Sequence, residues 1–149
     1  MQVDPNYAAQ RLAIMIVASA KADGDPRTLD LWCKAAGISV RGLQYVCAAA
    51  GISPVASRDL SRIFRLVIRT VVEGHPWEPF ARLDADPRTV TRLLDRAGLN
   101  GCPRDVPSFV SKQRFIEDPV IRGILCSSAT GALAQSGLDH RASWKSPCA

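Results

Sequence analysis

Helix start and stop signals recur along this chain and constrain its fold more than any other feature. An Asp or Ser stands directly before a proline at Asp4-Pro5, Asp25-Pro26, Ser53-Pro54 and Asp86-Pro87. Such a pair starts a helix well, because the Asp or Ser side chain caps free amides and proline is favoured at the first helical position. Glycines, which readily adopt the conformation that ends a helix, follow at Gly37, Gly51 and Gly98. The signals therefore predict an all-helical chain.

Apolar residues between these signals recur at helical spacing, and no alternating strand pattern competes with it. We expect helices over residues 5–22, 26–36, 39–50, 54–73, 77–83, 87–97, 108–116 and 119–135. Residues 100–107 are expected to form a loop, and residues 136–149 a frayed tail. The chain then divides into an N-terminal helix over 1–24, a central region over 25–103 and a C-terminal part over 104–149.

Composition and the reactive residues narrow the function. The formal net charge of the 149-residue chain is +5, which is common among nucleic-acid binders and also found in basic domains that bind nothing anionic. The five cysteines are widely spaced with no C-x-x-C pair, so we expect reduced thiols in a cytoplasmic protein, no metal and no cofactor. The apolar run over 12–20 is too short to cross a bilayer. Neither His75 nor His140 belongs to a recognisable catalytic motif, so no enzyme is expected.

One segment, residues 28–54, has the pattern of a helix-turn-helix. Gly37 would form the tight turn, Ile38 would fill the space between the two helices, and Ser39 would cap the second helix. Leu43 and Val46 of the second helix would face inward and hold the two helices together. The pattern predicts that residues 39–50 form a helix able to enter the major groove of DNA.

The outward side chains of this second helix suit contact with DNA. Arg41 can form two hydrogen bonds to guanine, Gln44 can pair with adenine, and Tyr45 can reach a phosphate or a sugar. Small residues such as Gly42 would allow the helix to approach the groove closely. The residues expected to bind DNA from this helix are Ser39, Val40, Arg41, Gln44 and Tyr45.

The expected helix over 54–73 carries a basic stripe formed by Arg58, Arg62, Arg65 and Arg69, which are spaced four, three and four residues apart. Apolar residues occupy the opposite side of that helix. Two interpretations are open. The stripe is either the solvated face of a core helix or a surface that contacts phosphates, and we expect Arg62 to make such a contact.

The helix-turn-helix pattern extends into a family resemblance. The turn Gly37-Ile38-Ser39 is followed by Leu43 and by Gly51-Ile52-Ser53-Pro54, and Arg62-Ile63 or Arg65-Leu66 comes later. Over about residues 25–100 this resembles the AraC family of bacterial transcription regulators. The family's DNA-binding unit has two helix-turn-helix subdomains joined by a long central helix. The resemblance implies that residues 57–73 form this linking helix and that residues 77–97 form the second subdomain.

By this resemblance, a second reading helix would present Arg88, Thr91, Arg92 and Arg96 to DNA. The chain departs from the family pattern at Ser57 and over residues 84–87, and it has no β-rich effector domain. No small-molecule effector is therefore expected. The hypothesis is sequence-specific binding of double-stranded DNA by a bacterial transcription regulator, with a homodimer as an open alternative to a single chain.

The alternative is a protein-interaction module on the same scaffold, without DNA binding. Trp77 and Trp144 could contact a protein partner in that case.

Two segments of the sequence are similar to each other, since Asp25-Pro26-Arg27-Thr28 resembles Asp86-Pro87-Arg88-Thr89. We attribute this similarity to shared capping chemistry rather than to a repeated structural unit.

Overall fold

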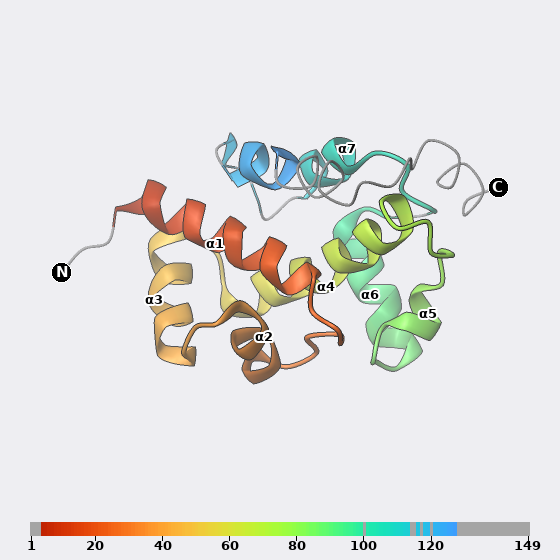
Figure 1. Ribbon diagram of the computed structural model, residues 1–149, viewed down its shortest axis with the longest axis horizontal. Coiled ribbons are helices and arrows are strands. Elements are labelled where there is room, and N and C mark those ends of the chain that lie inside the picture. Colours follow the sequence, from red (N-terminus) through yellow and green to blue (C-terminus); the bar gives the residue numbers. More distant parts are fainter. Residues whose placement is uncertain (1–3, 100, 114–115, 117, 120, 128–149) are drawn as a thin grey trace.

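A computed structural model describes residues 4–99, 101–113, 116, 118–119 and 121–127 (Figure 1). Its helices are α1 (Pro5–Ala20), α2 (Leu29–Ala36), α3 (Val40–Ala50), α4 (Pro54–Val71), α5 (Pro79–Arg82), α6 (Pro87–Ala97) and α7 (Val106–Ser111). Residues 119 and 121–127 are also helical. These described parts contain no strand, so the predicted all-helical fold is confirmed.

Helices α1 and α4 form the centre of the packing. The long helix α1 crosses α3 and α4 and packs mainly against these two, while α6 and α7 pack against α4 (Figure 1). Trp32 of α2, Leu43 of α3 and Phe64 of α4 are completely buried. The ring of Phe64 stacks on that of Phe109 in α7, with 6.2 Å between the ring centres. Burial of these large apolar side chains supplies the main free energy of folding.

Most of the predicted start signals act as expected. The side chains of Asp4, Ser39, Ser53 and Asp86 each accept a hydrogen bond from a backbone amide in the first turn of the helix that follows. Helices α2, α3 and α6 end at glycines with φ near 70°, where a β-carbon would be strained. Local capping chemistry therefore sets both ends of α3 and α6.

The start of α2 is the main correction to the predicted helices. The helix begins at Leu29, and its cap is Thr28 rather than Asp25. Asp25 does not cap a helix because its carboxylate binds the guanidinium of Arg62. The two similar Asp-Pro-Arg-Thr segments thus differ in structure, since Asp86 caps α6 directly.

Other boundaries shift by smaller amounts. Helix α1 ends at Ala20 rather than at residue 22. The carbonyl of Ala22 accepts hydrogen bonds from Arg65 and Arg69 and takes no part in the helix. The helix expected over 77–83 is only the single turn α5, and α7 starts at Val106 within the expected loop. The expected tail over 136–149 and the end of the helix over 119–135 lie outside the described residues.

The described cysteines differ in state. Cys33 and Cys47 are buried free thiols, and burial raises the pKa of Cys47 despite its hydrogen bond to Ser57. Cys102 is disulfide-bonded, so the expectation of reduced thiols throughout is wrong at this position.

None of the helices in the described ranges is both long enough and apolar enough to cross a membrane.

Candidate nucleic-acid interface

The turn between α2 and α3 is built by short-range contacts around Gly37. Gly37 has φ 70° and ψ 35°, and its amide and that of Ile38 bond to the carbonyls of Lys34 and Cys33. Ser39 then accepts a hydrogen bond from the Gly42 amide at 3.0 Å. A β-carbon on Gly42 would lie 3.0 Å from Ile38 Cγ1, so this glycine makes room for the side chain that fills the turn. The turn therefore fixes how α3 leaves α2.

The outer face of α3 presents three polar side chains to solvent. Arg41, Gln44 and Tyr45 are exposed, and 60% of the surface of Tyr45 is accessible. The guanidinium carbon of Arg41 lies 6.0 Å from the centre of the Tyr45 ring, within the range of a cation–π contact. On the opposite face, Leu43 and Val46 are buried, as predicted. The periodicity of α3 thus separates a polar outer face from a core face.

The two residues at the start of α3 have a structural role. The Ser39 hydroxyl oxygen accepts from the first turn, and Val40 is partly buried and packs against the core. Arg41 and Gln44 differ from Ser39 and Val40, because the side chains of Arg41 and Gln44 have no hydrogen-bonded or ion-paired partner in the part of the chain that the structure describes. The groups free to bind a ligand on α3 are therefore those of Arg41, Gln44 and the Tyr45 hydroxyl.

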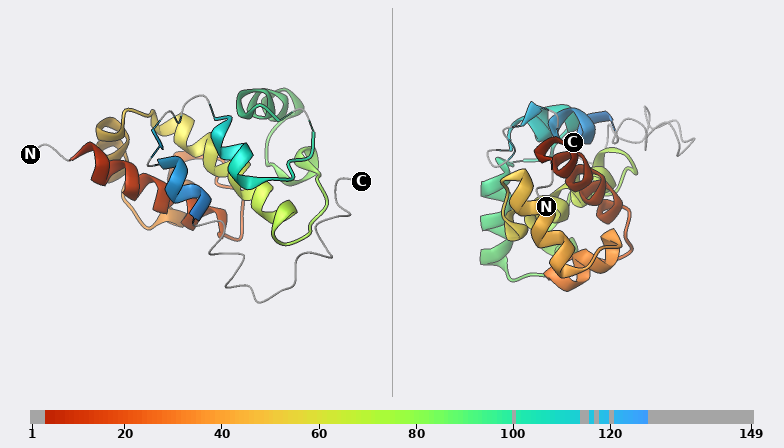
Figure 2. Two further views of the ribbon diagram at one scale, coloured as in Figure 1. Left: turned by 90° about the horizontal axis from the view of Figure 1, so that it is seen from above. Right: turned by 90° about the vertical axis from the view of Figure 1, so that its left-hand side faces the viewer.

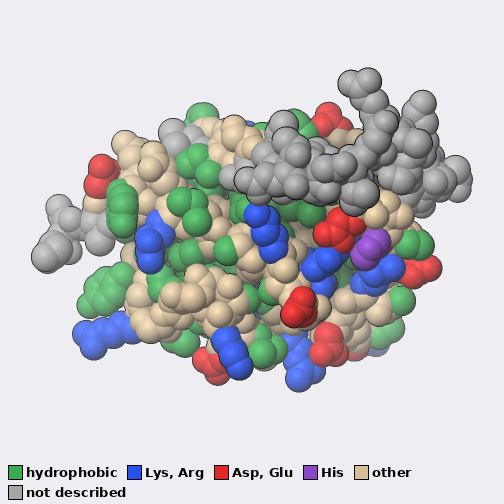
Figure 3. Space-filling model, viewed as in Figure 1, with side chains coloured by type: hydrophobic (Ala, Val, Ile, Leu, Met, Phe, Trp, Pro, Cys, Tyr) green, Lys and Arg blue, Asp and Glu red, His purple; other side chains and the backbone are tan. Residues whose placement is uncertain are grey.

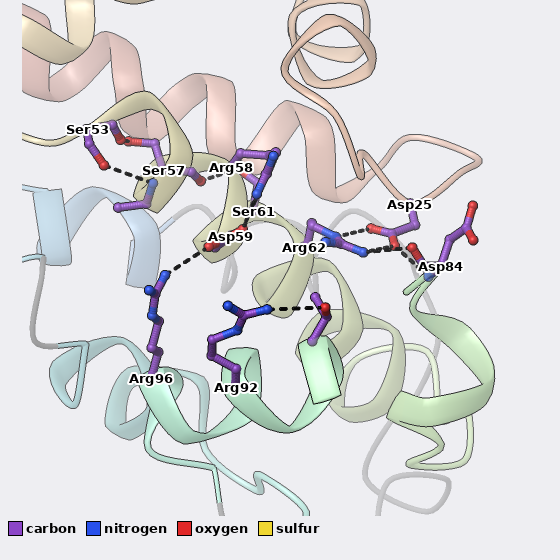
Figure 4. A network of polar contacts seen from close by, with 12 residues as sticks. Asp25, Ser53, Ser57, Arg58, Asp59, Ser61, Arg62, Asp84, Arg92 and Arg96 are labelled. Atoms are coloured by element: carbon purple, nitrogen blue, oxygen red, sulfur yellow. Dashed lines mark hydrogen bonds and ion pairs between the residues drawn. The ribbon is translucent and has the colours of Figure 1, made fainter. Parts of the chain in front are cut away.

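The expected second reading helix also has an exposed basic face. The four predicted residues, together with Pro87 and Asp95, line an open surface groove of about 460 Å³; they are Arg88, Thr91, Arg92 and Arg96. Arg92 donates to the hydroxyl of Thr89, and Arg96 pairs with Asp59 of α4 at 3.3 Å (Figure 4). Since 56% of the Arg96 side chain stays accessible, the pair does not remove it from the surface.

The prediction that Arg62 contacts DNA is wrong. Only 3% of Arg62 is exposed, and its guanidinium donates two hydrogen bonds to Asp25 and one to the carbonyl of Asp84 (Figure 4). Arg65 also turns inward, toward the carbonyls of Ala22 and Asp23. The basic stripe of α4 is therefore neither a solvated face nor a phosphate surface at these positions.

A sequence signal for this burial was present. Small hydroxyl residues stand among the apolar residues of α4 at Ser57, Ser61 and Thr70, and all three are buried. Apolar and small residues thus cover most of the circumference of α4 and leave only the narrow arginine stripe, so neighbouring segments enclose part of that stripe and its arginines need internal partners. Asp25, the partner of Arg62, precedes α4 by a long stretch of chain and could not be assigned from spacing.

The two tryptophans proposed for a protein partner, and a possible metal site, can also be checked against the structure. Trp77 is partly buried against the core, and Trp144 lies outside the described residues. No group of three or more His, Cys, Asp or Glu side chains in the described ranges is arranged to hold a metal ion.

Helices α3 and α6 have similar directions. Both run roughly vertically in Figure 1, and both are seen nearly end-on, toward the same edge, in the left view of Figure 2. Helix α4 lies between them in both views.

Comparisons of the chain with protein-family models, curated proteins and solved structures found no match.

Proposed function

We propose that this chain binds double-stranded DNA and reads its sequence with α3. The observation that carries this is the outer face of α3, where Arg41, Gln44 and Tyr45 are exposed. Arginine and glutamine are among the side chains that best distinguish guanine and adenine in the major groove. The turn at Gly37 and the cap at Ser39 position the backbone of α3, so binding would require ordering of the reading side chains and not of the helix itself.

A second contact through α6 supports the proposal. Arg88, Thr91 and Arg92 are exposed on α6, which has an axis similar to that of α3 (Figures 1 and 2). Two helices at the two ends of a linking helix could enter successive major grooves, as the AraC-like pattern of the sequence implies. In this arrangement α3 reads bases and α6 contributes phosphate contacts, and the protein acts as a transcription regulator.

The test is fluorescence anisotropy of the full chain with random and selected duplexes over a salt series. Phosphate-dominated affinity falls steeply with salt. Arg41→Ala should lose preference for the selected sequence, at a cost of about 1–3 kcal/mol in binding free energy. Arg11→Ala is the matched control, because Arg11 is exposed on α1, a helix whose other side packs against α3. Absence of binding at low salt would overturn the proposal.

One observation favours a homodimer, which the sequence left open. Tyr7 and Ile14 lie on one face of α1, with 56% and 62% of their surface exposed. A second copy of the chain would cover this apolar pair, and a dimer would also supply two reading helices for a palindromic site. Sedimentation of the wild type and of Ile14→Ser distinguishes a monomer from a dimer formed through α1, since only that dimer would dissociate in the variant.

A further inference from the structure

A second concave site lies on a different part of the surface from the groove of α6. It is a cavity of about 440 Å³ lined by Asp23, Asp25, Arg65, Leu66, Arg69, His75 and Arg82. Three segments form it: the loop after α1, the second half of α4, and the chain from His75 to the end of α5. Figure 3 shows basic, acidic and histidine side chains gathered toward one end of the face that carries this region.

Two guanidinium groups at this cavity have no carboxylate partner within the described residues. Arg65 donates only to the carbonyls of Ala22, at 3.1 Å, and Asp23, at 3.0 Å. Nη1 of Arg82 lies 3.4 Å from the Nδ1 atom of His75. A partly buried cation without a counter-ion is unfavourable, because burial removes water that carbonyl groups replace only in part.

Two arginines at the cavity leave a hydrogen-bond donor unused. The Nε atoms of Arg69 and Arg82 are buried and have no hydrogen-bond partner among the described residues. Buried donors of this kind are rare and indicate a missing acceptor. Burial, together with the neighbouring charges of Arg69 and Arg82, lowers the pKa of Arg65. An anion in the cavity would supply acceptors and separate these like charges.

The acidic residues around the cavity do not fill this role. Asp25 is neutralised by Arg62, and Glu73 pairs with Arg69 at 2.8 Å. Asp23 is exposed, and its carboxylate has no cationic partner in the described part of the chain. It lines the cavity and would weaken the binding of an anion there. Two cations, on Arg65 and Arg82, therefore remain uncompensated by an ion pair.

We propose that this cavity binds a small organic dianion, a phosphate monoester or a dicarboxylate, whose oxygens pair with Arg65 and Arg82. Two charges match the two unpaired guanidinium groups, which are suited to phosphate and carboxylate oxygens. A cavity of about 440 Å³ also leaves room for an organic part beside the anionic groups. The site thus provides a place for a small-molecule ligand that the sequence did not indicate.

The cavity and the candidate DNA face lie on different sides of α4. In the left view of Figure 2, α6 lies on one side of α4, and the end of α1, where the loop begins, lies on the other. The dianion would therefore bind without entering the DNA surface. It would join the loop after α1 to α5, two segments already connected through Asp25 and Asp84.

The experiment is isothermal titration calorimetry of the full chain with inorganic phosphate and, separately, with succinate, at constant ionic strength and without DNA. We expect millimolar or tighter binding of at least one of them, and the stronger probe identifies the anion class. Arg82→Gln removes the charge of a side chain that makes few structural contacts, and should weaken binding about tenfold or more. Asp23→Asn removes the opposing charge and should strengthen binding.

Three results would overturn the proposal, the third of which comes from a separate DNA titration of Arg82→Gln. One is the absence of heat from both probes with the folded wild type, shown to be folded by circular dichroism. The second is equal affinity in the wild type, Arg82→Gln and Asp23→Asn, which would mean an adventitious ion only. If Arg82→Gln weakened DNA binding and left the probes unaffected, the cavity would hold a DNA phosphate rather than a small ligand. Since the calorimetric titration contains no DNA, its outcome is independent of whether the chain is a DNA-binding protein.

Discussion

Arg62 and Asp25 form a two-contact ion pair inside the molecule although 37 positions separate them in the sequence. Nε and Nη2 of Arg62 donate to the two oxygens of Asp25 at 2.9 and 2.8 Å. The amide of Asp84 donates to the same carboxylate at 2.8 Å, and the Asp84 carbonyl accepts from Arg62. One buried pair therefore connects α4, the loop before α2 and the segment before α6.

Removal of one partner of this pair should be costly. Arg62→Ala leaves Asp25 buried without a counter-ion, and we expect the free energy of unfolding to fall by about 3–5 kcal/mol. The double variant Arg62→Met with Asp25→Leu should recover much of the loss, since no charge is then buried. Urea denaturation followed by circular dichroism measures both effects.

Arg27 provides a matched control for that measurement. It pairs with Asp84 at 2.8 Å, but both side chains are more than half exposed, at 54% and 63%. Arg27→Ala should therefore change the free energy of unfolding by about 0–1 kcal/mol. Equal losses in Arg27→Ala and Arg62→Ala would show that the inner pair does not hold the fold.

The turn between α2 and α3 should depend on the backbone conformation of Gly37 rather than on space. A β-carbon at Gly37 would meet no atom within 4 Å, but its φ of 70° lies in the left-handed region. We expect Gly37→Ala to lower the free energy of unfolding by about 1–2 kcal/mol. Gly37→Asn should cost less, because asparagine tolerates this conformation. Thermal denaturation of the two variants tests the order, and a smaller loss for alanine would contradict it.

The cap of α6 should give a pH-dependent contribution to stability. Hydrogen bonds from the Thr89 hydroxyl and amide lower the pKa of Asp86. Because this pKa is lower in the folded chain than in the unfolded one, the contribution is present above the unfolded pKa. It is lost as the pH falls through the folded pKa.

The pKa of Asp86 can be followed directly by a carboxyl NMR titration. Thr89→Val removes the hydroxyl donor but keeps the backbone amide, so the pKa of Asp86 should rise toward the ordinary aspartate value. An unchanged titration in Thr89→Val would mean that the hydroxyl does not stabilise the ionised cap.

Helix α6 should contribute affinity without sequence preference if the proposed DNA contact is correct. Arg92 is exposed, and its only hydrogen bond in the described ranges is to Thr89 on its own helix. Arg92→Ala should weaken binding to all duplexes alike and reduce the slope of log affinity against log salt by about one. Anisotropy titrations over the same salt series measure this slope. A loss confined to one duplex sequence would instead indicate base reading by Arg92.

Features that depend on neighbouring residues were predictable. The caps at Ser39 and Asp86 and the turn at Gly37 involve residues within one helical turn, so the local sequence is sufficient. The exposure of Arg41 and Gln44 follows from the spacing of the apolar residues Leu43 and Val46. Prediction of these features was correct because hydrogen bonding and amphipathic spacing act over short distances.

The sequence alone determined the helical fold, the ends of α3 and α6, and the polar outer face of α3. Tertiary structure decided what Asp25 does, because the buried guanidinium of Arg62 competes for its carboxylate more strongly than free helix amides exposed to water. Asp86, in a similar segment without a buried cation nearby, remains a cap. The cavity at Arg65 and Arg82 was likewise decided by packing, since its walls come from three segments whose meeting no local pattern encodes.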